Sequence, residues 1–316
     1  MISCTEFIAA YSELFAYIDE THGKEEVRRF WDYLFEPDGK GIPLINFVKE
    51  EGIRGCYSYW KGTLNEEAAD FTMYLNEKRG YFKNVMHYCP SKGRLLKLRD
   101  EIGLEPYPDY CMHCDGYRQA IENVGLKYVF DFQGCENASC ALLVYDPKTF
   151  DGRIIVDEDT VIMDRKSEDN EYYHPDFHSS MNMGINYLGT RYGVEAVEAY
   201  LKKYTVDVYG GCIRAVKQDG LRALEQHIRN TYEKEHAPEA LTTECTDDCL
   251  TVRVEFCPAV RHLHKTGRVV SDWFVYTTKT VMQTIADECG LSFEMLHYDA
   301  ESGAAEYSFR RIGEQA

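Results

Sequence analysis

The sequence predicts an α+β fold, built as two tandem copies of a helices-plus-antiparallel-sheet unit packed as a pseudo-dimer. The main observation is a repeat: an alternating apolar run ends twice in an aromatic residue, a cysteine and a proline, at residues 88–90 and 256–258. Proline suits the first turn of a helix, so each run predicts a strand that leads into a helix. Cys89 and Cys257 would then lie at helix N-termini, where the helix dipole favours the thiolate.

Two further landmarks recur in the same order. Gly52 and Gly220 each lie 37 residues before one of these cysteines, and a Gly-Leu pair follows at 125–126 and again at 290–291. Landmarks at nearly constant spacing indicate a tandem duplication of a unit of ordinary domain length. The predicted divisions are copy one at 1–148, an acidic connector at 149–177 and copy two at 178–316.

Apolar periodicity and turn residues place the elements of copy one. The predicted elements are helices over 5–20, 24–36, 42–51 and 54–68, a hairpin over 71–89, helices over 91–101 and 110–124, and strands over 126–133 and 140–146. This order implies a small antiparallel sheet with helices on one face and at one end.

The connector is acidic and has no apolar period, apart from one short strand predicted over 153–156. Copy two then repeats the order of copy one. Its predicted elements are helices over 178–191, 194–209 and 212–233, a hairpin over 240–256, helices over 258–266 and 272–289, and strands over 291–298 and 304–311.

Composition narrows the class of protein. The chain has 316 residues, 44% of them apolar, and no apolar run approaches the ~20 residues of a membrane span. Its first residues lack the features of a signal peptide, so we expect a cytoplasmic protein. The net charge of −18 would repel nucleic acid phosphates. We therefore expect a small-molecule substrate, no nucleic acid and no membrane, in a monomer with an internal pseudo-twofold or a weak homodimer.

Cysteines concentrate in copy one. In a cytoplasmic chain, twelve cysteines favour thiols or metal ligands over disulfides. Two of them form a Cys-x-x-Cys pattern, whose spacing lets both sulfurs bind one ion. The predicted ligands of a zinc ion or an iron–sulfur cluster are Cys89, Cys111, Cys114 and Cys140, with Cys135 as a substitute for the last. The alternative is that these cysteines are ordinary small buried hydrophobes.

The two copies differ in these thiols. Copy two keeps its Cys-Pro pair but has no cysteine at the positions that match Cys111, Cys114 and Cys140. This favours copy one as the binding or catalytic half and copy two as a structural half. Asp109, just before the Cys-x-x-Cys pattern, could serve as a general base or as a helix N-cap.

Histidines leave open the opposite assignment, in which copy two is the catalytic half. His262 follows Cys257 by about one and a half helical turns and could approach its thiolate. His178 lies at a predicted helix start and could cap that helix or act as an acid or base. His264 shares no helical face with His262 and is expected at the surface.

A family resemblance follows from these motifs. A Cys-Pro after a strand, the Cys-x-x-Cys with Asp115, and a final hairpin containing Cys140 resemble the L-2-amino-thiazoline-4-carboxylic acid hydrolase family. The segment from His178 to Cys257 is similar to the same family, and the final hairpin resembles small-molecule-binding domains of the vinyl-reductase type. Copy two departs by lacking the Cys-x-x-Cys, and copy one by lacking a histidine in its first helix.

The resemblance implies a hydrolase that acts on a C–N or C=N bond of a small cyclic amidine or thiazoline-like substrate, with a cysteine or metal centre. The catalytic candidates are Cys89, Asp109, Asp115, Cys257, His178 and His262. The alternative is a non-catalytic protein that binds a small molecule or a metal, including an iron–sulfur cluster.

Overall fold

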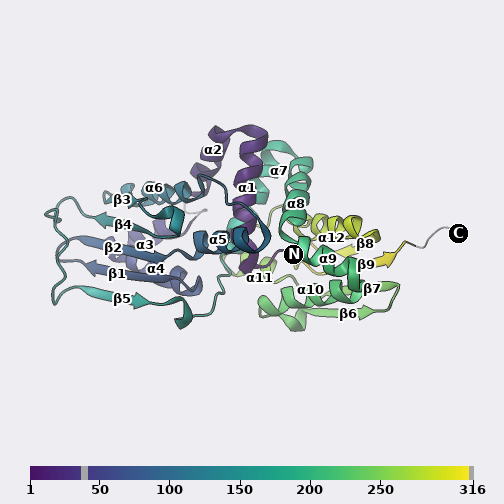
Figure 1. Ribbon diagram of the computed structural model, residues 1–316. Coiled ribbons are helices and arrows are strands. Elements are labelled where there is room, and N and C mark those ends of the chain that lie inside the picture. Colours follow the sequence, from purple (N-terminus) through teal and green to yellow (C-terminus); the bar gives the residue numbers. More distant parts are fainter. Residues whose placement is uncertain (37–41, 313–316) are drawn as a thin grey trace. The chain divides into compact units, whose positions relative to one another are not determined.

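The computed structural model describes residues 1–36 and 42–312. Residues 37–41, in predicted copy one, and 313–316, at the end of predicted copy two, lie outside it. The described residues form helices and two antiparallel sheets, which confirms the α+β class (Figure 1). The chain divides into a continuous unit, Phe15–His174, and a split unit, which joins Met1–Leu14 to Pro175–Ala316.

The continuous unit has a five-stranded sheet in the order β3-β4-β2-β1-β5. Its strands are β1 (Asp70–Asn76), β2 (Tyr81–Tyr88), β3 (Lys127–Asp131), β4 (Cys140–Tyr145) and β5 (Val161–Arg165). Its helices are α2 (Lys24–Leu34), α3 (Leu44–Glu51), α4 (Ile53–Glu66), α5 (Pro90–Ile102) and α6 (Tyr117–Glu122), and α1 (Phe7–His22) begins in the split unit and ends here.

Helices α3, α4 and α6 contribute to the core of the continuous unit together with the sheet. Trp60 of α4 stacks on Phe82 of β2, with ring centroids 5.5 Å apart and ring planes 4° from parallel. Phe71 and Met73 of β1 are fully buried in the same core. Burial of large aromatic rings contributes much of the stability of a core of this kind.

The split unit has a four-stranded sheet in the order β6-β7-β9-β8. Its strands are β6 (Leu241–Cys245), β7 (Cys249–Val254), β8 (Leu291–Tyr298) and β9 (Ala305–Arg311). Its helices are α7 (Phe177–Tyr192), α8 (Val194–Val208), α9 (Gly210–Asp219), α10 (Leu221–Lys234), α11 (Pro258–Lys265) and α12 (Tyr276–Cys289).

The first fourteen residues are bound into the split unit by buried polar contacts. The Tyr200 hydroxyl donates a hydrogen bond to the carbonyl of Ala10 at 2.7 Å, and Lys203 Nζ lies 2.6 Å from Glu13 Oε2. Both contacts join α8 to the first half of α1. The first turn of the chain is thereby positioned beside helices that follow residue 175.

Two local features are the same in both units. The four strands β3-β4-β2-β1 follow the same order as β8-β9-β7-β6. In each unit the second strand of the hairpin leads into a Cys-Pro pair, with Cys89 as the N-cap of α5 and Cys257 as the N-cap of α11. Both predicted strand–Cys-Pro–helix junctions are therefore confirmed.

Three predicted elements were wrong in detail. The connector strand is β5, which pairs with the edge strand β1, whereas residues 153–156 have no strand partner. The single helix over 212–233 is two helices, because Gly220 has a φ of 71° and ends α9. The helix over 110–124 begins as the 3-10 segment η2 (Tyr110–Gly116) before α6.

Across the described residues, no helix combines the length and the apolar character that crossing a membrane requires.

Candidate functional site

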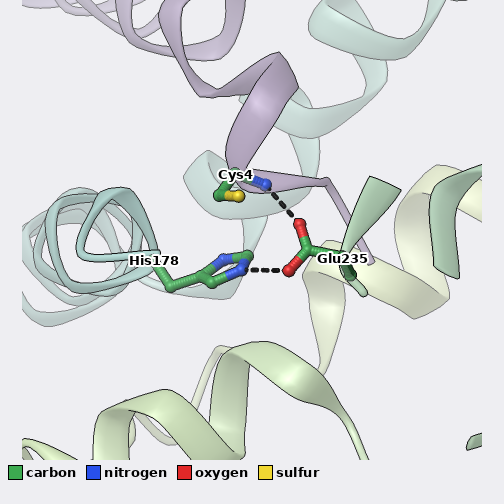
Figure 2. A group of neighbouring side chains, drawn as sticks. All are labelled: Cys4, His178 and Glu235. Carbon is green, nitrogen blue, oxygen red and sulfur yellow. Dashed lines mark hydrogen bonds and ion pairs between the residues drawn. The ribbon is translucent and has the colours of Figure 1, made fainter. Parts of the chain in front are cut away.

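Three side chains of the split unit form a compact buried group (Figure 2). One ligand atom each of Cys4, His178 and Glu235 lies within 4.8 Å of the other two. His178 Nε2 is 2.8 Å from Glu235 Oε2, and the Cys4 N–H donates to Glu235 Oε1 at 2.6 Å. The three residues are only 1%, 2% and 2% exposed. Among the described residues, no other group of three or more His, Cys, Asp or Glu side chains is as compact.

Local structure brings each of these residues into place. Cys4 opens the 3-10 segment η1 (Cys4–Glu6), whose N-cap Ser3 forms a capping box with Glu6. His178 is the second residue of α7, and Glu235 is the C-cap of α10. The ends of three helical segments therefore meet at the group. Helix ends leave backbone groups without partners inside the helix, and here the Cys4 N–H at the start of η1 takes Glu235 Oε1 as its acceptor.

Glu235 is ionised in this environment. Burial acts to raise the pKa of Glu235, but the His178 ring and the Cys4 N–H offset this effect and lower that pKa to about 2. The carboxylate accepts from both neighbours, one on each oxygen. The group therefore has a fixed negative charge beside an imidazole and a thiol.

A second pair of polar side chains lies next to the group and is more exposed. His262 Nε2 is 3.3 Å from Asp176 Oδ1, with side-chain exposures of 19% and 31%. The rings of His262 and His178 have centroids 6.4 Å apart. The His262 side chain is thus more exposed than the buried His178 and Glu235. The His262–Asp176 pair forms the solvent-facing edge of the site.

Cys257 is buried beside Met1. Its Sγ lies 3.3 Å from the sulfur of Met1, and burial raises the pKa of the Cys257 thiol despite its position at the start of α11. The structure pairs His178 with Glu235 and His262 with Asp176. A pair between Cys257 and either histidine stays a prediction.

The thiols that the sequence predicted as metal ligands all lie in the continuous unit. Hydrogen bonds from the thiols of Cys111 and Cys140 lower the pKa of Cys135 to about 3, and the pKa values of those two donors are raised in return. Burial raises the pKa of Cys89 to about 11 and also raises the pKa of Cys114 well above its usual range. None of the twelve cysteines, all of which lie in the described part of the chain, forms a disulfide.

These thiols are close enough to influence one another but are not arranged around a common point. A tetrahedral zinc ion sets its sulfur ligands about 3.8 Å apart. Within the described part of the chain, no three of Cys89, Cys111, Cys114 and Cys140 lie within 4.8 Å of one another. They would have to move closer to share an ion, and this ligand set stays a prediction.

The two aspartates near the Cys-x-x-Cys pattern form surface ion pairs. Asp109 lies 2.8 Å from Lys24 Nζ, and Asp115 lies 2.7 Å from Arg118. Asp109 is at the N-cap position of η2, but its side chain makes no capping hydrogen bond. Their roles as acids or bases stay predictions.

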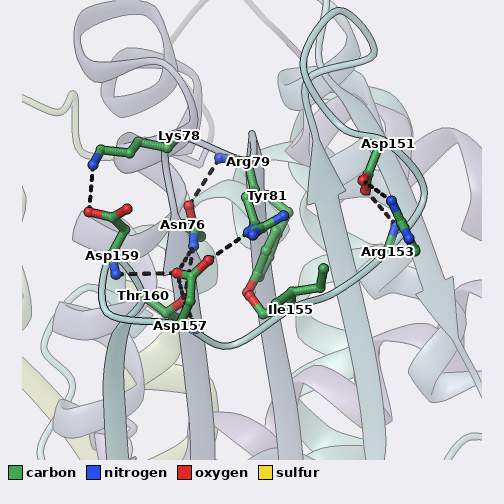
Figure 3. Close-up of polar contacts among 10 residues, drawn as sticks. All are labelled: Asn76, Lys78, Arg79, Tyr81, Asp151, Arg153, Ile155, Asp157, Asp159 and Thr160. Carbon is green, nitrogen blue, oxygen red and sulfur yellow. Dashed lines mark hydrogen bonds and ion pairs between the residues drawn. The ribbon is translucent and has the colours of Figure 1, made fainter.

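A polar network fixes the connector to the first hairpin (Figure 3). Asp157 accepts hydrogen bonds from Asn76 Nδ2 at 2.8 Å and from Arg79 Nε at 2.7 Å, and the Tyr81 hydroxyl donates to the Ile155 carbonyl at 2.7 Å. Hydrogen bonding to Arg79 lowers the pKa of Asp157. Both oxygens of the Asp157 carboxylate have protein partners, so we interpret the network as one that stabilises the fold.

An open groove of about 620 Å³ lies between α12 and β8 of the split unit. Lys279, His297 and Tyr298 are among the residues that line it. Burial raises the pKa of Tyr298.

Sequence reasoning found His178 and His262 but missed Cys4 and Glu235. One signal for Glu235 was available: it follows Gly220 by the same 15 residues that separate Glu67 from Gly52. Cys4 is outside every motif. The prediction also favoured copy one as the functional half, whereas the compact group lies in the unit built mainly from copy two.

No protein-family model, no curated protein and no solved structure matches this chain. The functional inference therefore depends on the site itself.

Proposed function

We propose that the chain is a hydrolase that opens a C–N or C=N bond of a small cyclic amidine or thiazoline-like compound at the Cys4–His178–Glu235 group. The observation that carries the proposal is the burial of a thiol, an imidazole and an ionised carboxylate within 4.8 Å of one another. Groups that activate water or a substrate are held in such water-poor positions in enzymes. The motif resemblance supplies the class of bond.

Ring opening gives one role to the buried group and another to the more exposed His262–Asp176 pair. Water adds to the amidine carbon, forming a C–O bond and a tetrahedral centre, while one proton of the water passes to the nitrogen of the C=N bond. The ring C–N bond then breaks as the new hydroxyl group becomes a carbonyl and gives up its proton to the buried group, and the leaving ring nitrogen takes a proton. His262, oriented by Asp176 at the solvent-facing edge, is placed to donate that proton. The buried group activates the water.

A second candidate function is non-catalytic binding of a small molecule or a metal. It is favoured by the low exposure of the group, since Cys4, His178 and Glu235 are each at most 2% exposed. A closed centre of this kind suits retention of a ligand better than rapid exchange. Turnover distinguishes the two candidates.

We also propose that the two units descend from a tandem duplication. Support comes from the shared strand order and from matched backbone conformations. Gly52 and Gly220 have φ of 60° and 71°, and Ala68 and His236, each 16 residues later, have φ of 51° and 53°. Positive φ is uncommon for residues other than glycine, so its recurrence at matching positions is informative. The pseudo-dimer packing of the copies stays a prediction.

The duplication proposal also explains why the split unit includes the first fourteen residues. Cys4 and His174 lie at matching positions, three residues before α1 and α7. Cys4, from copy one, belongs to the split unit, and His174, from the connector just before copy two, belongs to the continuous unit. Each bonds to a glutamate at the end of a helix of its unit: the Cys4 N–H donates to Glu235, and His174 Nδ1 bonds to Glu66. An exchange of the segments before α1 and α7 is what a fused swapped dimer would predict.

The test is turnover of a panel of thiazoline carboxylates, hydantoin-like rings and cyclic amidines, with ring-opened products detected by mass spectrometry. For a substrate that is turned over, His178→Ala should reduce kcat/KM by about 10²–10⁴-fold. His262→Gln should lower kcat with little effect on KM. The matched control is His264→Gln on the same helix, because His264 is exposed and bonds to the Glu301 carbonyl.

Failure of the wild-type protein to open any ring in the panel would count against the hydrolase and favour the binding protein. Equal losses in His262→Gln and His264→Gln would remove His262 from the mechanism.

A further inference from the structure

We propose that Cys4, His178 and Glu235 bind one divalent transition-metal ion, and that the ion is zinc. Thiolate sulfur, imidazole nitrogen and carboxylate oxygen are the three kinds of ligand that zinc takes from proteins. Magnesium and calcium prefer ligand sets made of oxygen alone. Three protein ligands leave a fourth position for water, which is typical of a catalytic zinc site.

The spacing of the three ligand atoms fits such an ion. Zinc bound at about 2.0–2.3 Å in tetrahedral geometry sets its ligand atoms about 3.3–3.8 Å apart. The three atoms lie within 4.8 Å of one another, and His178 Nε2 and Glu235 Oε2 are 2.8 Å apart. The longest of the three separations therefore has to shrink by at most about 1 Å, and the distance from His178 Nε2 to Glu235 Oε2 has to widen by about half that.

Charge balance favours the ion as well. The structure buries the Glu235 carboxyl group beside the Cys4 thiol, and both residues are at most 2% exposed. Adding a divalent cation to a carboxylate, a thiolate and a neutral imidazole gives a centre with no net charge. Burial of a neutral cluster costs far less than burial of an unbalanced charge.

The surrounding structure holds the ligands in position. The Cys4 N–H donates to Glu235 Oε1 at 2.6 Å, which fixes the carboxylate and leaves Oε2 on the His178 side. The capping box of Ser3 and Glu6 fixes the turn that contains Cys4. Hydrogen bonds to metal ligands of this kind orient them and tune the site.

This inference deepens the proposed hydrolase, because bound zinc lowers the pKa of its water to about 7 and so supplies the nucleophile. It rests on the proposed function only for that role of the water. Metal binding can be measured without turnover, so either proposal can fail while the other stands.

The experiment is titration of the full-length, chelator-treated protein with Co²⁺ alone, followed by absorption spectroscopy and by displacement with Zn²⁺. One cobalt per chain should give tetrahedral d–d bands and a thiolate-to-cobalt charge-transfer band. Cys4→Ser should abolish the charge-transfer band, and Glu235→Gln should weaken binding by at least about tenfold. The double variant Cys111→Ser with Cys114→Ser is the matched control, because it removes thiols of the other unit.

Loss of the bands in the double variant but not in Cys4→Ser would overturn the proposal in favour of a metal site in the continuous unit. Absence of tetrahedral bands in the wild-type protein would also overturn it. If Cys4→Ser does not fold, the wild-type protein still provides a test. Zn²⁺ should then slow alkylation of Cys4 in mild denaturant but leave the half-exposed Cys245 unaffected, and equal protection of both would contradict the site.

Discussion

His178 Nε2 lies 2.8 Å from Glu235 Oε2, and the two side chains are 3% and 1% exposed. A hydrogen bond at this depth is sensitive to removal of one partner, because the remaining polar group stays buried without it. The pair therefore allows a stability test that does not depend on a substrate.

Glu235→Gln keeps the shape of the side chain but removes its charge. We expect the free energy of unfolding of the metal-free protein to fall by about 2–3 kcal/mol, since charged hydrogen bonds to His178 and Cys4 are replaced by weaker neutral ones. Urea unfolding followed by circular dichroism measures the change. Glu233→Gln, at an exposed position of α10, is the matched control and should change stability by less than about 0.5 kcal/mol. Similar losses in both variants would mean that the buried pair contributes nothing specific.

Cys135 should be the most reactive thiol of the continuous unit near neutral pH. Hydrogen bonds from Cys111 and Cys140 lower the pKa of Cys135, and the thiolate is the nucleophile in alkylation. Mass spectrometry after brief treatment with iodoacetamide should find Cys135 modified first and the buried Cys56 unmodified.

The paired variants Cys140→Ala and Cys140→Ser test the cause. Alanine removes a hydrogen-bond donor to Cys135 and should slow its alkylation several-fold, while serine keeps a donor and should slow it less. Modification of Cys135 no faster than that of Cys245 would contradict the lowered pKa.

Local patterns were enough to predict the strand–Cys-Pro–helix junctions. Alternation of apolar residues fixes a strand, and proline at the first helical position fixes the helix that follows, so Cys89 and Cys257 could be placed from their neighbours alone. The α+β class follows from the order of such elements. Both depend on residues close together in the chain.

The buried group could not be predicted in the same way. Cys4 and Glu235 are 231 residues apart and meet only because η1 packs beside the end of α10. No periodicity or spacing encodes a contact over that separation. The connector strand was predicted at the wrong residues for the same reason. Residues 161–165 form β5 because they pair with β1, and local propensity does not encode that pairing.

Gly52 and Gly220 allow a test of the matched backbones of the two units. Their φ values of 60° and 71° lie in a region that alanine rarely adopts. Gly52→Ala and Gly220→Ala should each lower the free energy of unfolding by about 1–3 kcal/mol. Gly62→Ala is the control: an added Cβ there meets nothing within 4 Å, and alanine should stabilise α4 by up to about 1 kcal/mol. A cost at one of the two glycines and none at the other would count against their equivalence.

The lowered pKa of Asp157 predicts how the stability of the continuous unit changes at low pH. Arg79 lowers the pKa of Asp157 in the folded protein below the value of about 3.9 that an aspartate has in an unfolded chain. As the pH falls past that value, the unfolded chain binds a proton at Asp157 before the folded protein does. Stability from the network is therefore full above about pH 4 and is lost as the pH falls further. Asp157→Asn should lower stability at neutral pH and flatten its decline between about pH 5 and about pH 3, as measured by urea midpoints. Asp159→Asn, two residues away in a surface pair with Lys78, is the matched control and should keep the wild-type decline. An unchanged acid profile in Asp157→Asn would show that the network of Asn76, Arg79 and Asp157 does not hold the connector in place.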